Sequence, residues 1–102
     1  MNTKTEQTVA RILFNYSIKI STAESCTGGL LSSRLTDVAG SSSYIKENFV
    51  TYANEAKIEL LDVSQETLET YGAVSEQCAK DMAEVLYKKT GCDVAISTTG
   101  IA

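Results

Sequence analysis

Hydroxyl, amine and glycine residues cluster at three points of this 102-residue sequence, each directly after a stretch with strand character. The three segments are ESCTGG (24–29), TYANEAK (51–57) and TTG (98–100). Such residues suit acyl transfer, because a serine hydroxyl attacks carbonyl carbon and a neutral lysine amine can accept the serine proton. The sequence has no histidine, which excludes Ser-His-Asp and Cys-His mechanisms within this chain and a histidine-built metal site.

The ESCTGG segment lies where a short apolar run gives way to a helical pattern. Backbone N–H groups at a helix start bind oxyanions or phosphates, so Ser25 is a candidate nucleophile held at that positive end. Local pattern alone favours a simpler interpretation, in which Ser25 or Thr27 is the helix N-cap and the two glycines permit close packing. Cys26 is a rival nucleophile, although burial as a small apolar side chain also accounts for it.

The second segment carries a candidate base. Asn54 is expected to cap a helix and to place Lys57 at the third helical position, where the helix dipole disfavours an ammonium. Partial burial lowers the pKa of a lysine further, and Tyr52 at the strand end can share or relay the proton. The alternative is that Lys57 is a solvated surface residue and Tyr52 an ordinary strand aromatic.

The third segment, with Thr99 and Gly100, follows the last predicted strand. Ligands of open α/β sheets bind beyond the carboxyl ends of the strands. A parallel sheet would bring all three strand ends to one edge, so we expect Ser25, Lys57 and Thr99 to meet there. The alternative is that Gly100 only ends a strand.

The elements that must position these residues alternate along the chain. Helical periodicity predicts helices over 3–16, from about 30 to 38, after 54, after 64 and over 76–90, the last capped by Ser75. Strand character is found over 17–22, 44–53 and 93–98, and the last strand is nearly all apolar, as central parallel strands are. This order predicts an α/β fold with a layered sheet.

Composition limits the class of protein. A 43% hydrophobic, 22% charged chain of this length with net charge −4 is one globular domain without a general nucleic-acid surface. We find no apolar run long enough to span a membrane and no signal-peptide pattern. Three cysteines without metal-like spacing indicate reduced thiols and a cytoplasmic protein; Cys78 and Cys92 are expected in the core.

Together, the motifs ESCTGG, Tyr-x-x-E-A-K of YANEAK, GAVS and TGIA resemble one family over essentially the whole chain. It is the family of the C-terminal domain of the competence-damage-inducible protein CinA, the nicotinamide-mononucleotide deamidases. The resemblance implies a three-layer α/β/α sandwich and a Ser–Lys amidase that needs no metal or cofactor. Its substrate is a small nucleotide, whose carboxamide is hydrolysed to give nicotinate mononucleotide and ammonia.

Carried over to this sequence, the resemblance makes Ser25 the nucleophile and Lys57 the general base, with Tyr52 assisting proton transfer. The other matching residues are expected to bind substrate: Glu24, Cys26, Thr27, Gly28, Gly29, Thr99 and Gly100. The resemblance also implies a homodimer and a single domain over 1–102 that is incomplete at its C-terminal end, because family members continue past TGIA. Two alternatives remain at this point: a nucleotide-binding module without turnover, and a structural domain of a competence- or damage-associated protein.

Overall fold

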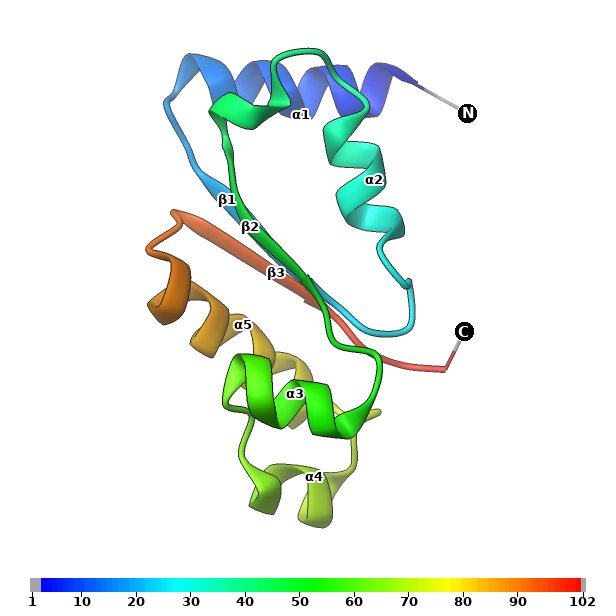
Figure 1. The fold of residues 1–102 in the computed structure, drawn as a ribbon. Coiled ribbons are helices and arrows are strands. Elements are labelled where there is room, and N and C mark those ends of the chain that lie inside the picture. Colours follow the sequence, from blue (N-terminus) through cyan, green and yellow to red (C-terminus); the bar gives the residue numbers. More distant parts are fainter. Residues whose placement is uncertain (1–2, 102) are drawn as a thin grey trace.

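The computed structural model describes residues 3–101, so that the final alanine of the TGIA motif lies outside the described residues. The chain forms a three-layer α/β/α sandwich (Figure 1), with α1 and α2 on one face of the sheet and α3, α4 and α5 on the other. This arrangement confirms the expected fold class. The elements in chain order are α1 (Thr3–Asn15), β1 (Ile20–Glu24), α2 (Leu30–Thr36), the 3₁₀ turn η1 (Ser41–Ser43), β2 (Ile45–Val50), α3 (Asn54–Leu61), α4 (Gln65–Tyr71), α5 (Glu76–Thr90) and β3 (Val94–Thr98).

The sheet has the order β2-β1-β3, and both pairings are parallel. The central strand β1 covers 20–24, two to three residues later than the sequence predicted, because the chain turns first at Ser17, whose φ is 54°. All five residues of β1 are buried although most of them are polar. Hydrogen bonds to the neighbouring strands therefore determine where β1 ends, and the pattern of hydrophobic residues does not reveal this position.

Two apolar clusters hold the layers together, one on each face of the sheet. Side chains of a strand alternate between its faces, and β1 accordingly sends Ile20 to one cluster and Ala23 to the other. The cluster against α1 and α2 contains Ala10, Leu13, Ile20, Leu35 and Tyr44. The cluster against α3 and α5 contains Ala23, Leu61, Val63, Cys78, Met82 and Leu86. Cys78 and Cys92 are buried, as the sequence predicted.

Helix ends follow local capping chemistry where the cap is a single side chain. The Ser75 hydroxyl accepts a hydrogen bond from the Cys78 N–H at 3.0 Å at the start of α5, and Ser64 does the same for Thr67 at the start of α4. Gly91 ends α5 with φ 68°, a left-handed conformation that glycine adopts without a Cβ clash. The α5 helix packs on β1 and β3 and fixes this face of the sheet.

The carboxyl ends of all three strands meet at one edge of the sheet. Glu24 pairs with Val50 on one side and with Thr98 on the other, so the segments after the strands leave the sheet together. The three candidate segments of the sequence therefore meet in space, as predicted.

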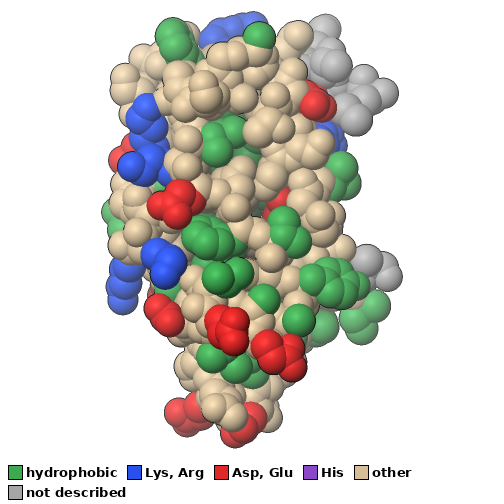
Figure 2. All heavy atoms as spheres, viewed as in Figure 1, with side chains coloured by type: hydrophobic (Ala, Val, Ile, Leu, Met, Phe, Trp, Pro, Cys, Tyr) green, Lys and Arg blue, Asp and Glu red, His purple; other side chains and the backbone are tan. Residues whose placement is uncertain are grey.

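Charge is unevenly distributed over the surface. Figure 2 shows acidic side chains at the end of the molecule formed by α3 and α4. Between the start of α3 and the end of α4, five carboxylates are exposed: Glu55, Glu59, Asp62, Glu66 and Glu69. Within residues 3–101, no helix combines the length and apolar character needed to cross a membrane.

Candidate active site

A buried serine and a buried lysine form the centre of the site. Lys57 Nζ lies 3.0 Å from Ser25 Oγ, within hydrogen-bonding distance. The two residues come from different layers: Ser25 follows the central strand β1, and Lys57 lies in α3, 32 positions away. Ser25 is 6% exposed and Lys57 1% exposed, so the alternative interpretation of Lys57 as a solvated surface residue is wrong.

Two backbone carbonyls fix the direction of the lysine amine. Lys57 Nζ lies 2.9 Å from the Thr51 carbonyl oxygen and 3.0 Å from that of Tyr52. As an ammonium, Lys57 donates one hydrogen bond to each carbonyl and one to Ser25 Oγ. As a neutral amine, it donates to both carbonyls and keeps its lone pair for the proton of Ser25. This geometry would allow a neutral Lys57 to accept a proton from Ser25.

The charge state of Lys57 follows from its surroundings. Burial lowers the pKa of Lys57 below its ordinary value, because the ammonium loses its hydration, while the neighbouring thiols of Cys78 and Cys26 act weakly in the other direction. Neither ion pair found among residues 3–101 involves Lys57. Lys57 therefore has no carboxylate that would hold its proton.

Lys57 sits one position further into α3 than the sequence predicted. The N-cap of α3 is Ala53, and Asn54 is already the first helical residue, without a side-chain cap. The Lys57 N–H donates the first intrahelical bond, to the Ala53 carbonyl at 3.2 Å. The predicted Asn54 cap is therefore wrong. The turn before α3 is held instead by the Lys57 amine, which donates hydrogen bonds to the carbonyls of Thr51 and Tyr52.

The ESCTGG loop does not place Ser25 or Thr27 at the N-cap of α2, and that interpretation is also wrong. The N-cap is Gly29, with φ 107° and no side-chain cap. Capping comes instead from the Glu24 carboxylate, which accepts hydrogen bonds from the N–H groups of Leu31 at 2.7 Å and Ser32 at 2.9 Å. The N–H groups of Leu31 and Ser32 at the start of α2 are thereby already bonded to a carboxylate of the protein itself.

Two other backbone donors follow Ser25 directly in the loop. In the described part of the chain, the N–H groups of Cys26 and Thr27 have no hydrogen-bond partner. The N–H of Ser25 itself is engaged with the Thr98 carbonyl at 3.0 Å. Free N–H groups directly after a nucleophilic serine are suited to an oxyanion.

The remaining predicted residues surround this centre in different ways. The side chain of Tyr52 points to the surface, since the residue is 69% exposed, whereas its carbonyl contacts the dyad. The Thr99 hydroxyl donates to the Ala73 carbonyl at 2.7 Å and ties the end of β3 to the turn before α5. A Cβ on Gly100 would lie 3.8 Å from Cys26 Sγ, so the chain after β3 passes close to the loop.

Other residues of the site were missed from the sequence. Thr98 contacts the loop through its carbonyl and also through its hydroxyl, which lies 2.8 Å from Thr27 Oγ1. Ser32 contributes both its N–H and its hydroxyl to Glu24. Thr51 supplies a carbonyl to Lys57. Thr98 could have been found from the sequence, because it belongs to the TTG segment. The contacts of Ser32 with Glu24 and of Thr51 with Lys57 depend on the tertiary fold.

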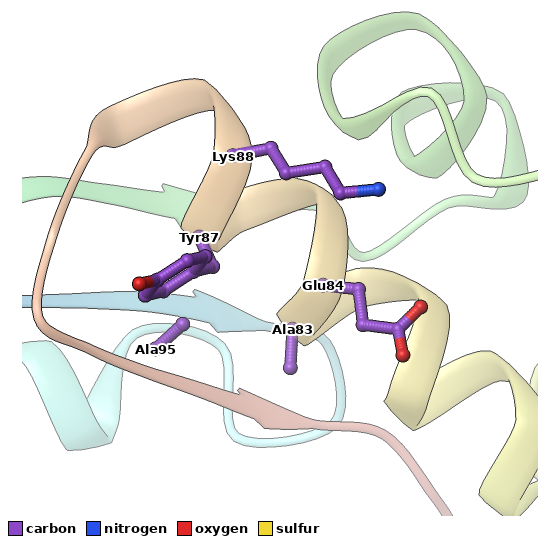
Figure 3. Close-up of a pocket in the computed structure, with 5 residues that line it drawn as sticks. All are labelled: Ala83, Glu84, Tyr87, Lys88 and Ala95. Carbon is purple, nitrogen blue, oxygen red and sulfur yellow. The ribbon is translucent and has the colours of Figure 1, made fainter.

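A hollow on the molecule lies away from this centre. It is formed between α5 and β3 (Figure 3) and is lined by Ala83, Glu84, Tyr87, Lys88 and Ala95. None of the residues of the serine–lysine centre lines it. Among the described residues, no group of three or more histidine, cysteine or acidic side chains is placed to hold a metal ion.

Fold and geometry together define a three-layer α/β protein with a buried serine–lysine pair at the carboxyl edge of a parallel sheet. The family model of the CinA C-terminal domain matches residues 2–102. The chain therefore belongs to the CinA C-terminal domain family, as the sequence motifs indicated.

Individual relatives agree with this assignment. The chain is 54% identical over 101 residues to a CinA-like protein of Chlorobium limicola, which covers 99% of this chain and 24% of that protein. The crystal structure of the competence/damage inducible protein CihA from Agrobacterium tumefaciens is similar with a TM-score of 0.90 and 40% identity, over 93% of this chain and 58% of that one. A CinA superfamily protein from Escherichia coli is similar with a TM-score of 0.86 and 37% identity, over 90% and 54% of the two chains. The chain thus spans about a quarter of the curated relative and little more than half of each solved structure.

Proposed function

We propose that the natural polypeptide carrying this chain is an amidohydrolase that converts nicotinamide mononucleotide to nicotinate mononucleotide and ammonia. One observation carries the proposal: Lys57 Nζ lies 3.0 Å from Ser25 Oγ while two carbonyls take its remaining hydrogens. Membership of the CinA C-terminal domain family supports the choice of substrate through the resemblance described above. The lack of histidine in the chain is compatible with this base.

The proposed reaction begins with proton transfer. Neutral Lys57 accepts the hydroxyl proton of Ser25 as Oγ attacks the carboxamide carbon of the substrate. The carbonyl oxygen becomes an oxyanion, which the free N–H groups of Cys26 and Thr27 stabilise. Loss of one such donor typically reduces the rate by roughly 10²–10³-fold.

The intermediate then collapses. The carbon–nitrogen bond breaks, the Lys57 ammonium gives its proton to the departing nitrogen, and ammonia leaves an acyl group on Ser25 Oγ. Lys57, neutral again, takes a proton from a water molecule that attacks the acyl carbon. The ester bond to Oγ breaks, Ser25 recovers its proton from Lys57, and nicotinate mononucleotide is released.

The test is ammonia release from nicotinamide mononucleotide by the natural polypeptide. We expect Ser25→Ala to abolish release while binding of the nucleotide is retained, and Cys26→Ala to remain active. Loss of activity in Cys26→Ala together with full activity in Ser25→Ala would transfer the nucleophile to Cys26. Binding without ammonia would indicate a nucleotide-binding module, and the absence of both would indicate a structural domain.

A further inference from the structure

Glu24 is a buried carboxylate at the end of the central strand. It is fully buried, and its backbone is paired on both sides, with Val50 of β2 and Thr98 of β3. Among residues 3–101, neither ion pair includes it. A buried charge without a cation requires strong hydrogen-bond donors, so the groups that face Glu24 must supply them.

Four donors do so. Glu24 Oε1 accepts hydrogen bonds from the Thr27 hydroxyl at 2.7 Å and the Leu31 N–H at 2.7 Å. Glu24 Oε2 accepts from the Ser32 N–H at 2.9 Å and the Ser32 hydroxyl at 2.6 Å. The carboxylate therefore connects the middle of the loop 25–29, which carries Ser25, and the start of α2 to the central strand.

Glu24 does not touch the reacting groups. Successive strand residues point to opposite faces of a sheet. The Glu24 carboxylate accordingly faces α2, and Ser25 Oγ faces Lys57 of α3. Any influence of Glu24 on the reaction must therefore be indirect, through the groups that donate hydrogen bonds to it, and this distinguishes Glu24 from a substrate-binding residue.

A chain of hydroxyl groups carries the influence to Ser25. The only hydroxyl proton of Thr27 is donated to Glu24, so the hydrogen bond between the Thr27 and Thr98 hydroxyls, at 2.8 Å, is donated by Thr98. Thr98 Oγ1 then keeps its lone pairs for the Ser25 N–H, 3.4 Å away, which is shared between this hydroxyl and the Thr98 carbonyl at 3.0 Å. Because the Glu24 carboxylate can only accept hydrogen bonds, it determines which group is the donor in each hydrogen bond of this series.

We propose that Glu24 is a positioning residue for the Ser25 nucleophile, acting through Thr27, Thr98 and the start of α2. This role rests on the proposed function, because it gives Glu24 a part in the reaction of Ser25. Glu24 fixes the loop so that Ser25 Oγ stays in line with Lys57 Nζ and the N–H groups of Cys26 and Thr27 stay free. The Leu31 and Ser32 N–H groups at the start of α2 are bonded to Glu24 and are therefore not available to the oxyanion.

Glu24→Gln is a sharp probe of this role. Burial raises the pKa of Glu24, but the hydrogen bonds from Ser32, Thr27 and Leu31 together outweigh it and hold this pKa below its ordinary value, so the native group is a carboxylate. A glutamine amide has one oxygen and one NH₂ group. Whichever way it turns, its NH₂ faces the backbone N–H of Leu31 or Ser32, and neither can become an acceptor.

The experiment measures acylation of Ser25 by p-nitrophenyl acetate, followed by intact-protein mass spectrometry, beside kcat and KM for nicotinamide mononucleotide. The matched control is Glu47→Gln, which makes the same change at an exposed residue of β2. We expect Glu24→Gln to reduce the acylation rate constant and kcat roughly 10–100-fold, the scale of a small misplacement of reacting groups. We expect KM to remain near the wild-type value and the control to behave as wild type.

The rate constant and the amplitude of acylation together distinguish a positioning role of Glu24 from an effect on protein stability alone. A purely structural role would leave the rate constant unchanged and reduce only the fraction of molecules that react, and this result would overturn the proposal. If Glu24→Gln does not fold, Thr98→Val removes one hydroxyl of the chain, and an unchanged rate constant there has the same meaning.

Failure of the proposed function is recognised separately. Acylation of wild-type Ser25 without nucleotide turnover would refute the substrate and still test Glu24, because the variants are compared by the same probe. A wild-type Ser25 that takes no acyl group would overturn the positioning role too, since there would be no nucleophile to position.

Discussion

Replacing Lys57 by methionine removes the proposed base and keeps an unbranched side chain that is one atom shorter. Lys57 is 1% exposed and its amine lies 3.0 Å from Ser25 Oγ, so no solvent group can take over its role at that distance. A positioned general base contributes typically about 10²–10⁴-fold to a rate. Because each factor of ten corresponds to about 1.4 kcal/mol, we expect the barrier to rise by about 3–5 kcal/mol.

The change also affects the folded state. The carbonyls of Thr51 and Tyr52 lose their donor, and an unsatisfied buried acceptor costs about 1–3 kcal/mol. Removal of an amine whose charged form is disfavoured by burial offsets part of this loss. Urea unfolding of wild type and Lys57→Met measures the remainder and shows whether the variant is folded under assay conditions.

The assay is ammonia release from nicotinamide mononucleotide as a function of pH. The proposed reaction depends on neutral Lys57, so wild-type activity should fall as pH decreases through the lowered pKa of this amine. The residual activity of Lys57→Met should lack this acid limb. A folded Lys57→Met protein that keeps kcat within a factor of about three would refute the assignment of the base, because a general base contributes at least about 10²-fold.

Three further predictions concern stability. Gly29→Ala should lower the free energy of unfolding in urea by about 1–2 kcal/mol, because the φ of 107° is strained for any residue with a Cβ. The added Cβ makes only an ordinary contact with Val50, so backbone strain is the whole cost. An unchanged unfolding midpoint would contradict this prediction. Ser75→Ala should cost about 1 kcal/mol by the same measurement, since the Cys78 N–H loses its acceptor, and a neutral effect would argue against the cap. Glu24, whose pKa is lowered in the fold, contributes stability that is complete above its unfolded pKa of about 4.3 and is lost as pH falls through the folded value. The stability difference between wild type and Glu24→Gln should therefore shrink in acid, and a constant difference would show that the carboxylate is not stabilised by folding.

Local signals predicted much of the fold. The caps Ser64 and Ser75 and the terminating Gly91 act within a few residues of the helix they bound, so the sequence alone locates α4 and α5. The alternation of helices and strands indicated parallel pairing, and parallel pairing brought the three strand ends to one edge. The meeting of Ser25 and Lys57 followed from this reasoning and from the family motifs.

The details of the site depend on tertiary contacts. The end of β1 was placed too early because its polar residues look like a loop, whereas pairing on both sides buries them. The cap of α2 was misassigned because its acceptor is Glu24, seven and eight residues before the N–H groups it binds. Thr98 was overlooked in favour of Thr99 because only the register of β3 against β1 decides which of the two faces the Ser25 loop.

The proposed reaction requires that the amine of Lys57 be neutral, so that it can accept the proton of Ser25. An NMR titration of the Lys57 side chain, assigned by comparison with Lys57→Met, measures its pKa directly. We predict a value below the ordinary lysine pKa of about 10.4 that coincides with the acid limb of the rate profile. A Lys57 that titrates at or above the ordinary value, in a protein fully active at neutral pH, would contradict the account.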